Sequence, residues 1–247
     1  MTLNPGLCSV TLRSRSIDEV VAIAADAGLA GIEWGGDVHV PEAAAAARAK
    51  AACAEAQLRI FSLGSYYRAG TFGEFEPVLD VASALGAPRV RIWAGSVEPH
   101  EADAGTWDAV VEDTRRIAAL AAGRGVDLAF EFHNRSLTAT VDGTLELLDR
   151  VDRPNVGTYW QPAVGVSDTE ALDALRSLLG RLMGIHCFSW WPHGERLPLD
   201  ARSALWEGVL ETARGSERDL DVMLEFVADD LPENLLRDAA TLRGWLG

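Results

Sequence analysis

The sequence has little cysteine, no long apolar run and little positive charge, and each shortage excludes a class of protein. Its three cysteines, Cys8, Cys53 and Cys187, are scattered through apolar segments, which indicates reduced core thiols and argues against a disulfide framework or a zinc cluster. No segment approaches the ~20 apolar residues of a membrane span, and the N-terminal stretch has no apolar core typical of a signal peptide. We therefore expect a cytoplasmic protein without a membrane partner.

Acidic residues outnumber basic ones, because 37 Asp and Glu stand against 22 Lys and Arg, giving a formal net charge of −15. Such a charge repels phosphate backbones at long range, so we expect no nucleic-acid partner. The 247 residues, 48% of them hydrophobic, can bury a sizeable core. No linker or low-complexity tract divides them, which predicts one domain over residues 1–247.

Short β-rich runs alternate with longer helical patterns along the chain. The strand candidates are 6–12, 30–35, 58–64, 89–95, 127–133, 155–160, 183–189 and 221–227. The intervening patterns carry apolar residues at helical spacing, and Ser16 with Glu19 forms a capping-box pair. Strand followed by helix eight times, with roughly 30 residues per unit, predicts an α/β fold, a single (β/α)8 TIM barrel. A doubly wound sheet is the alternative, but no glycine-rich phosphate turn follows Val10.

Four consecutive strand candidates end in one polar residue among hydrophobic ones. They are FEFH, YWQP, IHCF and LEFV, which contain Glu131, Gln161, His186 and Glu225 at intervals of 30, 25 and 39 residues. The C-terminal strand ends of a barrel share one mouth, so these side chains should converge. A single such residue usually has a capping or core role, whereas four in one mouth favour a site. Carboxylate, amide and imidazole donors suit Mn²⁺, Mg²⁺, Co²⁺ or Zn²⁺.

Aromatic residues gather at the same strand ends, where their rings suit the apolar faces of a sugar. We expect Trp34, Trp93 and Trp160 to contact a substrate. Other rings at these ends would pack against loops or a neighbouring copy, so a homo-oligomer is a possible assembly. Strand alternation turns Glu33 and Arg91 toward the barrel interior, where they could pair with each other or with the substrate, and we expect a structural ion pair.

The segments GIEW, LAFEFHN, IHCFSWWPHGERLPLD and MLEFVADDLPENL, in this order, resemble the xylose-isomerase-like barrel superfamily of sugar isomerases, sugar-phosphate isomerases and epimerases. The resemblance covers nearly the whole chain. It implies one divalent ion, most often manganese, bound by Glu131, Gln161, His186 and Glu225. It also implies an enzyme acting on a small sugar or keto-sugar, with Glu131 and Glu225 as the catalytic groups that move a proton next to a carbonyl through an enediolate.

The same resemblance extends to residues that bind substrate. An arginine eight to ten residues after the strand-seven histidine commonly contacts sugar oxygens in relatives, which places Arg196 in that role. His193 lies in the same loop, and His133 follows Glu131 closely, so both are expected to help bind or orient the substrate.

The sixth strand departs from the family pattern, which is often Asp with His three residues later; here the residues are Gln161 and Val164. A neutral amide is a weaker ligand than a carboxylate, so ion affinity should fall, or Gln161 should bind substrate.

Two alternatives to an isomerase or epimerase stay open. One is a lyase of the same superfamily, of keto-sugar or inositol-ketone dehydratase or deglycosidase type. The other is a non-catalytic carbohydrate-binding barrel. The apurinic endonuclease branch is discounted, because five histidines and a charge of −15 do not suit three zinc ions and DNA.

Overall fold

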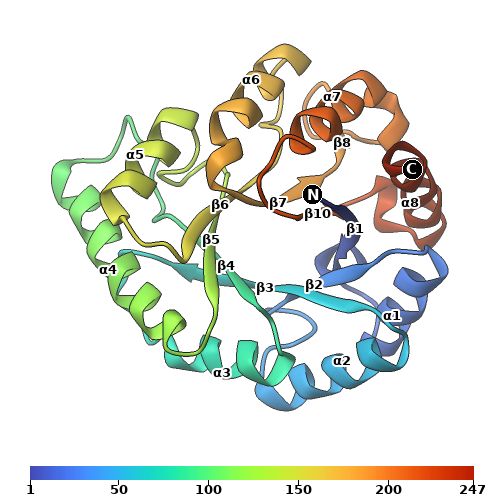
Figure 1. Ribbon diagram of the computed structural model, residues 1–247, viewed down its shortest axis with the longest axis horizontal. Helices are drawn as coiled ribbons and strands as arrows, with labels where there is room; N and C mark the ends of the chain where they lie inside the picture. The colour runs from blue at the N-terminus through green and yellow to red at the C-terminus, as the bar shows by residue number, and fades with distance from the viewer.

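The computed structural model describes all 247 residues and shows a closed barrel of parallel strands surrounded by helices (Figure 1). Strands follow one another around the barrel in chain order, and β1 closes the ring against β10. The (β/α)8 prediction is therefore confirmed. The barrel strands are β1 (Leu3–Cys8), β2 (Gly31–Gly35), β3 (Arg59–Arg68), β4 (Arg89–Trp93), β5 (Asp127–Glu131), β6 (Val156–Trp160), β7 (Leu182–Cys187) and β10 (Leu220–Leu224).

The helices form an outer ring that covers the strands (Figure 1). They are α1 (Ile17–Asp26), α2 (Ala43–Glu55), α3 (Glu76–Leu85), α4 (Ala104–Ala122), α5 (Val141–Val151), α6 (Asp168–Leu178), α7 (Ser203–Ala213) and α8 (Pro232–Leu246). The expected capping box at Ser16 and Glu19 is present, and Ser167 with Glu170 forms a second one at the start of α6. Both boxes satisfy amide groups that a helix start otherwise leaves without partners.

Five predicted strands end earlier than the sequence indicated, at residues 8, 93, 131, 187 and 224. The first begins at Leu3 and stops at Cys8, and residues Ser9–Leu12 form a 3-10 turn. This turn is held to the next strand because the Ser9 hydroxyl accepts a hydrogen bond from the Gly35 amide at 2.9 Å. The seventh ends at Cys187. Beyond it, β8 (Ser189–Trp190) pairs antiparallel with β9 (Arg196–Leu197) in a small hairpin at the barrel mouth.

The apolar core has two layers. A large cluster fills the space between strands and helices, and a smaller one, which includes Phe61, Tyr159 and Met223, fills the barrel interior. Glycine makes room for this interior filling, because a Cβ atom at Gly6 or Gly31 would meet the Phe61 ring at 2.4 Å. The barrel is therefore closed by packed side chains below its mouth, and polar groups above them can form a site.

The remaining observations concern cysteines and membrane spans. All three cysteines are buried and unpaired, as expected, and Cys187 belongs to the layer between strands and helices. None of the helices combines the length and the apolar character that crossing a bilayer requires.

Candidate active site

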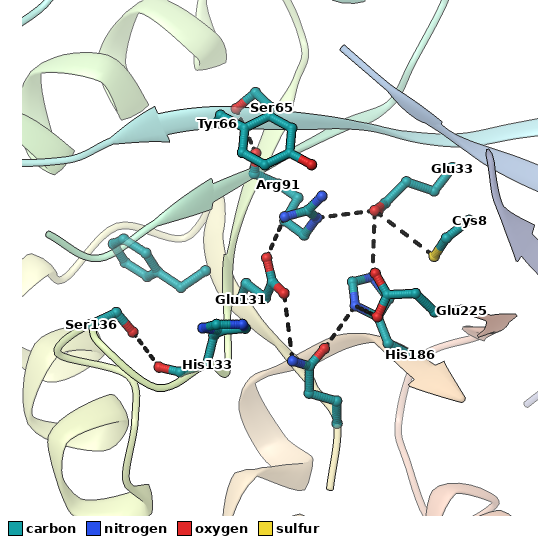
Figure 2. A network of polar contacts seen from close by, with 12 residues as sticks. Cys8, Glu33, Ser65, Tyr66, Arg91, Glu131, His133, Ser136, His186 and Glu225 are labelled. Carbon is teal, nitrogen blue, oxygen red and sulfur yellow. Dashed lines mark hydrogen bonds and ion pairs between the residues drawn. The ribbon is translucent and has the colours of Figure 1, made fainter. Parts of the chain in front are cut away.

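The four polar residues predicted at consecutive strand ends meet in the barrel mouth. Glu131 ends β5, Gln161 and Glu225 directly follow β6 and β10, and His186 lies in β7. The imidazole Nδ1 of His186 lies 2.9 Å from Gln161 Oε1 and 3.5 Å from Glu225 Oε2. Gln161 Nε2 lies 3.5 Å from Glu131 Oε1. Figure 2 shows Glu131, His186 and Glu225 turned toward a common space.

Arg91 forms the expected ion pair with Glu33 and also a second one that was not expected. Its Nε lies 3.0 Å from Glu33 Oε1, and its Nη1 bonds Glu131 Oε2. The Ser62 hydroxyl donates to the other oxygen of Glu33 at 2.6 Å. Only 3% of Arg91 is exposed, so its charge acts on these two carboxylates with little screening by water. Arg91 thus joins the second, fourth and fifth strands of the barrel (Figure 2).

These contacts close into a ring of polar groups. His186 Nε2 lies 3.4 Å from Glu33 Oε1, on the side of the imidazole opposite Gln161. The ring runs from Glu33 through Arg91, Glu131, Gln161 and His186 back to Glu33. Every member is buried, so each charge in the ring is compensated by a neighbour where water is scarce.

The charges in this ring shift the pKa of several members. Burial disfavours the charged form of His186, but the carboxylates of Glu225 and Glu33 outweigh it and raise its pKa to about 9. Burial raises the pKa of Glu225 to about 7, although the nearby His186 opposes this. Burial also opposes ionisation of Glu33, yet Arg91 and His186 lower its pKa overall. Without a bound ion the site therefore favours a charged imidazolium at neutral pH, and a cation at Nδ1 would have to displace this proton.

The donor atoms around His186 Nδ1 fit a divalent cation. Atoms that share such an ion lie ~2.0–2.3 Å from it and hence about 3 Å from one another. The spacings of 2.9 Å from Nδ1 to Gln161 and 3.5 Å to Glu225 match this condition. Arg91 bonds Oε2 of Glu131, so Oε1 remains available as a ligand on the side of Gln161. Glu131, Gln161, His186 and Glu225 could therefore hold one ion, with two formal negative charges among them.

A second group of donors lies on the opposite side of the same imidazole. Cys8 Sγ, Glu33 Oε1 and His186 Nε2 all lie within 4.8 Å of one another. Burial raises the pKa of the Cys8 thiol well above its usual value, and Arg91 Nε is 3.0 Å from Glu33 Oε1. A cation there would have to displace the thiol proton and lie beside a guanidinium, whereas on the Nδ1 side it displaces only the imidazole proton, so the Nδ1 side is the better candidate.

A pocket of about 240 Å³ opens above the ring. Glu131, Gln161 and Glu225 form its polar floor, and its walls include Phe188, Trp190 and Phe226. His133 and Asn134 also line it. Nδ1 of His133 lies 2.7 Å from the carbonyl oxygen of Asn134, which can only accept, so Nδ1 carries a proton. A small polar molecule with an apolar face would match this combination.

Three other residues expected to bind substrate, Trp93, Arg196 and His193, differ in their burial and contacts. Trp93 is half-buried against the His133 ring, with 4.4 Å between centroids. Arg196 lies at the mouth, where it forms an ion pair with Asp230 and stacks on Trp190 and Phe226. His193 is exposed in the loop between β8 and β9 and does not line the pocket.

The expectation for Trp34 and Trp160 is corrected. Both side chains are fully buried in the layer between strands and helices, and Trp160 packs edge-on against Trp206 of α7. Each lies next to a residue that faces the barrel interior, Glu33 or Tyr159, so strand alternation turns the tryptophan outward. Neither ring can contact a molecule in the pocket.

Sequence reasoning missed Cys8, Ser62 and Phe226. Cys8 pairs in register with Glu33, so the alternation that turned Glu33 inward could have identified it. Phe226 directly follows Glu225 and adopts a left-handed conformation with φ of 48°, which places its ring on the pocket wall. No sequence pattern predicts that conformation for a phenylalanine.

Comparison with known protein families decides the classification. The family model described as xylose isomerase-like TIM barrel matches residues 21–243. The chain belongs to the xylose isomerase-like TIM barrel family. The resemblance of its strand-end motifs to that family is thereby confirmed. No curated protein sequence matches the chain.

Solved structures similar to this member of the family share its fold at low sequence identity. The probable 3-DHS dehydratase AsbF from Bacillus anthracis has a TM-score of 0.81 at 19% identity, over 98% of this chain and 99% of the other. The 3-keto-D-glucoside 4-epimerase YcjR from E. coli has a TM-score of 0.71 at 18% identity, over 98% and 100%. The D-allulose 3-epimerase from Methylomonas sp. has a TM-score of 0.72 at 18% identity, over 100% and 98%.

Proposed function

We propose that the protein is a divalent-metal-dependent isomerase or epimerase that acts on a small sugar or keto-sugar. The observation that carries this proposal is that Glu131 and Glu225 line one pocket, with Gln161 beside Glu131 and His186 beside both Gln161 and Glu225. Two carboxyl groups in one pocket can take and return a proton at a carbon next to a carbonyl. Epimerases among the structural neighbours support the same chemistry.

Each residue of the pocket has its own role in the proposed reaction. Glu225, on the floor of the pocket, is placed to take the proton from the carbon next to the carbonyl, which leaves an enediolate. Return of the proton to the neighbouring carbon, with transfer of the hydroxyl proton to the former carbonyl oxygen, shifts the carbonyl. For inversion, Glu131 would first take up a proton from solvent and deliver it to the opposite face of the carbon. Arg91 and Gln161 hold Glu131 in place. When bound by Glu131, Gln161, His186 and Glu225, a divalent ion, manganese foremost and otherwise magnesium, cobalt or zinc, would polarise the carbonyl as a Lewis acid.

Solvent deuterium tests this proposal. Manganese-loaded protein is incubated in deuterated water with ketoses and keto-sugars, and deuterium at the carbon next to the carbonyl is followed by NMR. We expect incorporation with at least one sugar, and Glu225→Gln should reduce its rate by at least ~100-fold, the usual contribution of a general base. Absence of exchange across free, phosphorylated and oxidised sugars would refute the proposal.

A lyase is the second candidate function. The dehydratase structure has a TM-score of 0.81, and abstraction of the same proton followed by loss of a β-hydroxyl would make this pocket a dehydratase. Mass spectrometry of the incubations distinguishes the two, because isomerisation conserves the mass of the substrate and dehydration removes one water. A non-catalytic carbohydrate-binding barrel would bind sugar and produce neither exchange nor water loss.

The proposal also covers the cellular compartment and the partners of the protein. Three buried, unpaired cysteines support a reducing compartment, the cytoplasm. The only partner required is the small sugar, since the charge of −15 disfavours nucleic acid and anionic membrane surfaces. Association of identical chains is a prediction that analytical ultracentrifugation would test.

A further inference from the structure

The pocket is lined by no side chain of permanent positive charge that could neutralise an anionic substrate. Its thirteen lining residues include neither lysine nor arginine. Their ionisable side chains are Glu131, Glu225 and His133, and the two glutamates lie at the floor with 5% and 6% of their surface exposed. A phosphate or carboxylate in this space would face carboxylates of its own sign, in a partly desolvated site where such repulsion is poorly screened.

Three guanidinium groups at or below the mouth are already engaged. Arg91 lies beneath the floor between Glu33 and Glu131. Arg196 forms an ion pair with Asp230, and its Cζ lies 5.4 Å from the Trp190 ring centroid and 4.9 Å from that of Phe226.

Arg68, farther along the rim, is also outside the pocket. It donates to the Gly95 carbonyl at 2.9 Å and lies over the Trp93 ring at 4.2 Å. None of the three arginines is therefore free to meet an anion inside the pocket.

The opposite wall is built for an uncharged molecule. The Trp190 ring lies 4.8 Å from Phe188 and 5.8 Å from Phe226, centroid to centroid. Its indole nitrogen donates to the Phe226 carbonyl at 3.3 Å, which holds the ring in place. Such rings contact the C–H face of a sugar, while Asn134 and Gln161 offer neutral hydrogen-bonding groups for its hydroxyls.

We propose that this pocket selects an uncharged keto-sugar of monosaccharide size and discriminates against ketoses that carry a phosphate or carboxylate group. The inference rests on the proposed function and narrows its substrate class. A bound divalent ion would not reverse the selection, because it would displace the His186 proton, and Glu33, Glu131 and Glu225 then carry three negative charges against one on Arg91. The two charges of the ion would bring this set to zero and leave no positive excess.

The deuterium-exchange assay tests the inference when it compares D-fructose, D-fructose 6-phosphate and 5-keto-D-gluconate at equal ionic strength. We expect kcat/KM for exchange to be at least tenfold higher for the uncharged ketose than for either anion. Equal or faster exchange in an anionic ketose would overturn the inference and leave the proposed function standing. Exchange in none of the three, nor in any other sugar tested, would overturn the proposed function and the inference with it.

Release of Arg196 from its carboxylate provides a second test. Asp230→Asn removes the partner charge, and asparagine tolerates the left-handed backbone of this position, where φ is 52°. The variant should reduce the preference for the uncharged ketose by at least threefold, because a free guanidinium then lies at the mouth. Asp229→Asn is the matched control, since Asp229 is exposed and also left-handed, with φ of 55°. An unchanged preference in Asp230→Asn, or the same loss in both variants, would contradict the role given to the Arg196–Asp230 pair.

Discussion

Gln161 connects two groups that a carboxylate could not connect in the same way. Its amide nitrogen faces Glu131 Oε1 at 3.5 Å, and its oxygen accepts from His186 Nδ1 at 2.9 Å. A carboxylate has only acceptors, so it would repel Glu131 in the absence of a cation. The amide therefore stabilises the ring without an ion and lowers the negative charge available to hold one.

Gln161→Glu should change ion binding in a defined direction. The third carboxylate adds negative charge beside Glu131 and Glu225, so we expect manganese to bind at least tenfold more tightly, equal to about 1.4 kcal/mol. Isothermal titration calorimetry measures the affinity. Gln161→Ala is the control and should bind manganese more weakly than the wild type, because it removes an oxygen donor. The same affinity in all three proteins would show that residue 161 is not a ligand.

Arg91 compensates two buried carboxylates, and its loss should be costly. Arg91→Met leaves Glu33 and Glu131 without their common partner, and the free energy of unfolding should fall by about 3–5 kcal/mol, the range for a broken buried ion pair. Urea denaturation followed by circular dichroism gives the value. Arg48→Met is the control, because Arg48 and Asp18 are 61% and 63% exposed, and it should change stability by about 0.5 kcal/mol or less. An equally small loss of stability in Arg91→Met would contradict the role of Arg91 in compensating Glu33 and Glu131.

Sequence reasoning identified the strand-end residues more completely than their interactions. Glu131, Gln161, His186 and Glu225 stood out because each is a polar residue that interrupts an apolar run. The bond from Arg91 to Glu131 could not be predicted, because it depends on which of two carboxylates a long side chain reaches. The Arg196–Asp230 ion pair could not be predicted from the sequence either, because it depends on how two loops at the mouth fold together.

Strand alternation separates the tryptophans near the site into two groups. Trp34 lies within β2 and Trp160 ends β6, and both point outward into the helix layer. Trp190 lies in the short β8 strand above the barrel and lines the pocket. Proximity to a strand end alone did not distinguish these positions, whereas the inward or outward phase of each strand would have done so.

Two tryptophan variants test this separation. Trp160→Phe should leave KM for the exchanging sugar within about twofold, because the ring lies outside the barrel and its Nε1 has no hydrogen-bond partner to lose. Trp190→Ala should raise KM by about tenfold or more through loss of the aromatic wall, since an aromatic contact contributes about 0.5–1.5 kcal/mol beyond the apolar area that it buries. Steady-state exchange kinetics give both values. A larger change in KM from Trp160→Phe would show that the Trp160 side chain faces the barrel interior.

The closed barrel explains why residues far apart in the chain could be grouped from sequence. Each βα unit advances one strand around the ring, so strand order equals chain order and strand ends share one mouth. That rule predicted the architecture and the location of the site. It could not predict the hairpin of β8 and β9 or the early end of β1, because both depend on local contacts such as the bond between Ser9 and Gly35.

Manganese should stabilise the whole protein by binding to the folded state. At a free concentration 100 times the dissociation constant, binding adds about 2.7 kcal/mol, which for a chain of this size raises Tm by about 5–10 °C. Differential scanning calorimetry with manganese and with EDTA measures the shift. It should vanish in the double variant Glu131→Gln/Glu225→Gln and persist in Cys8→Ser, because the ion is expected on the Nδ1 side of His186. The reverse result would place the ion on the other side of the imidazole, between Cys8 and Glu33.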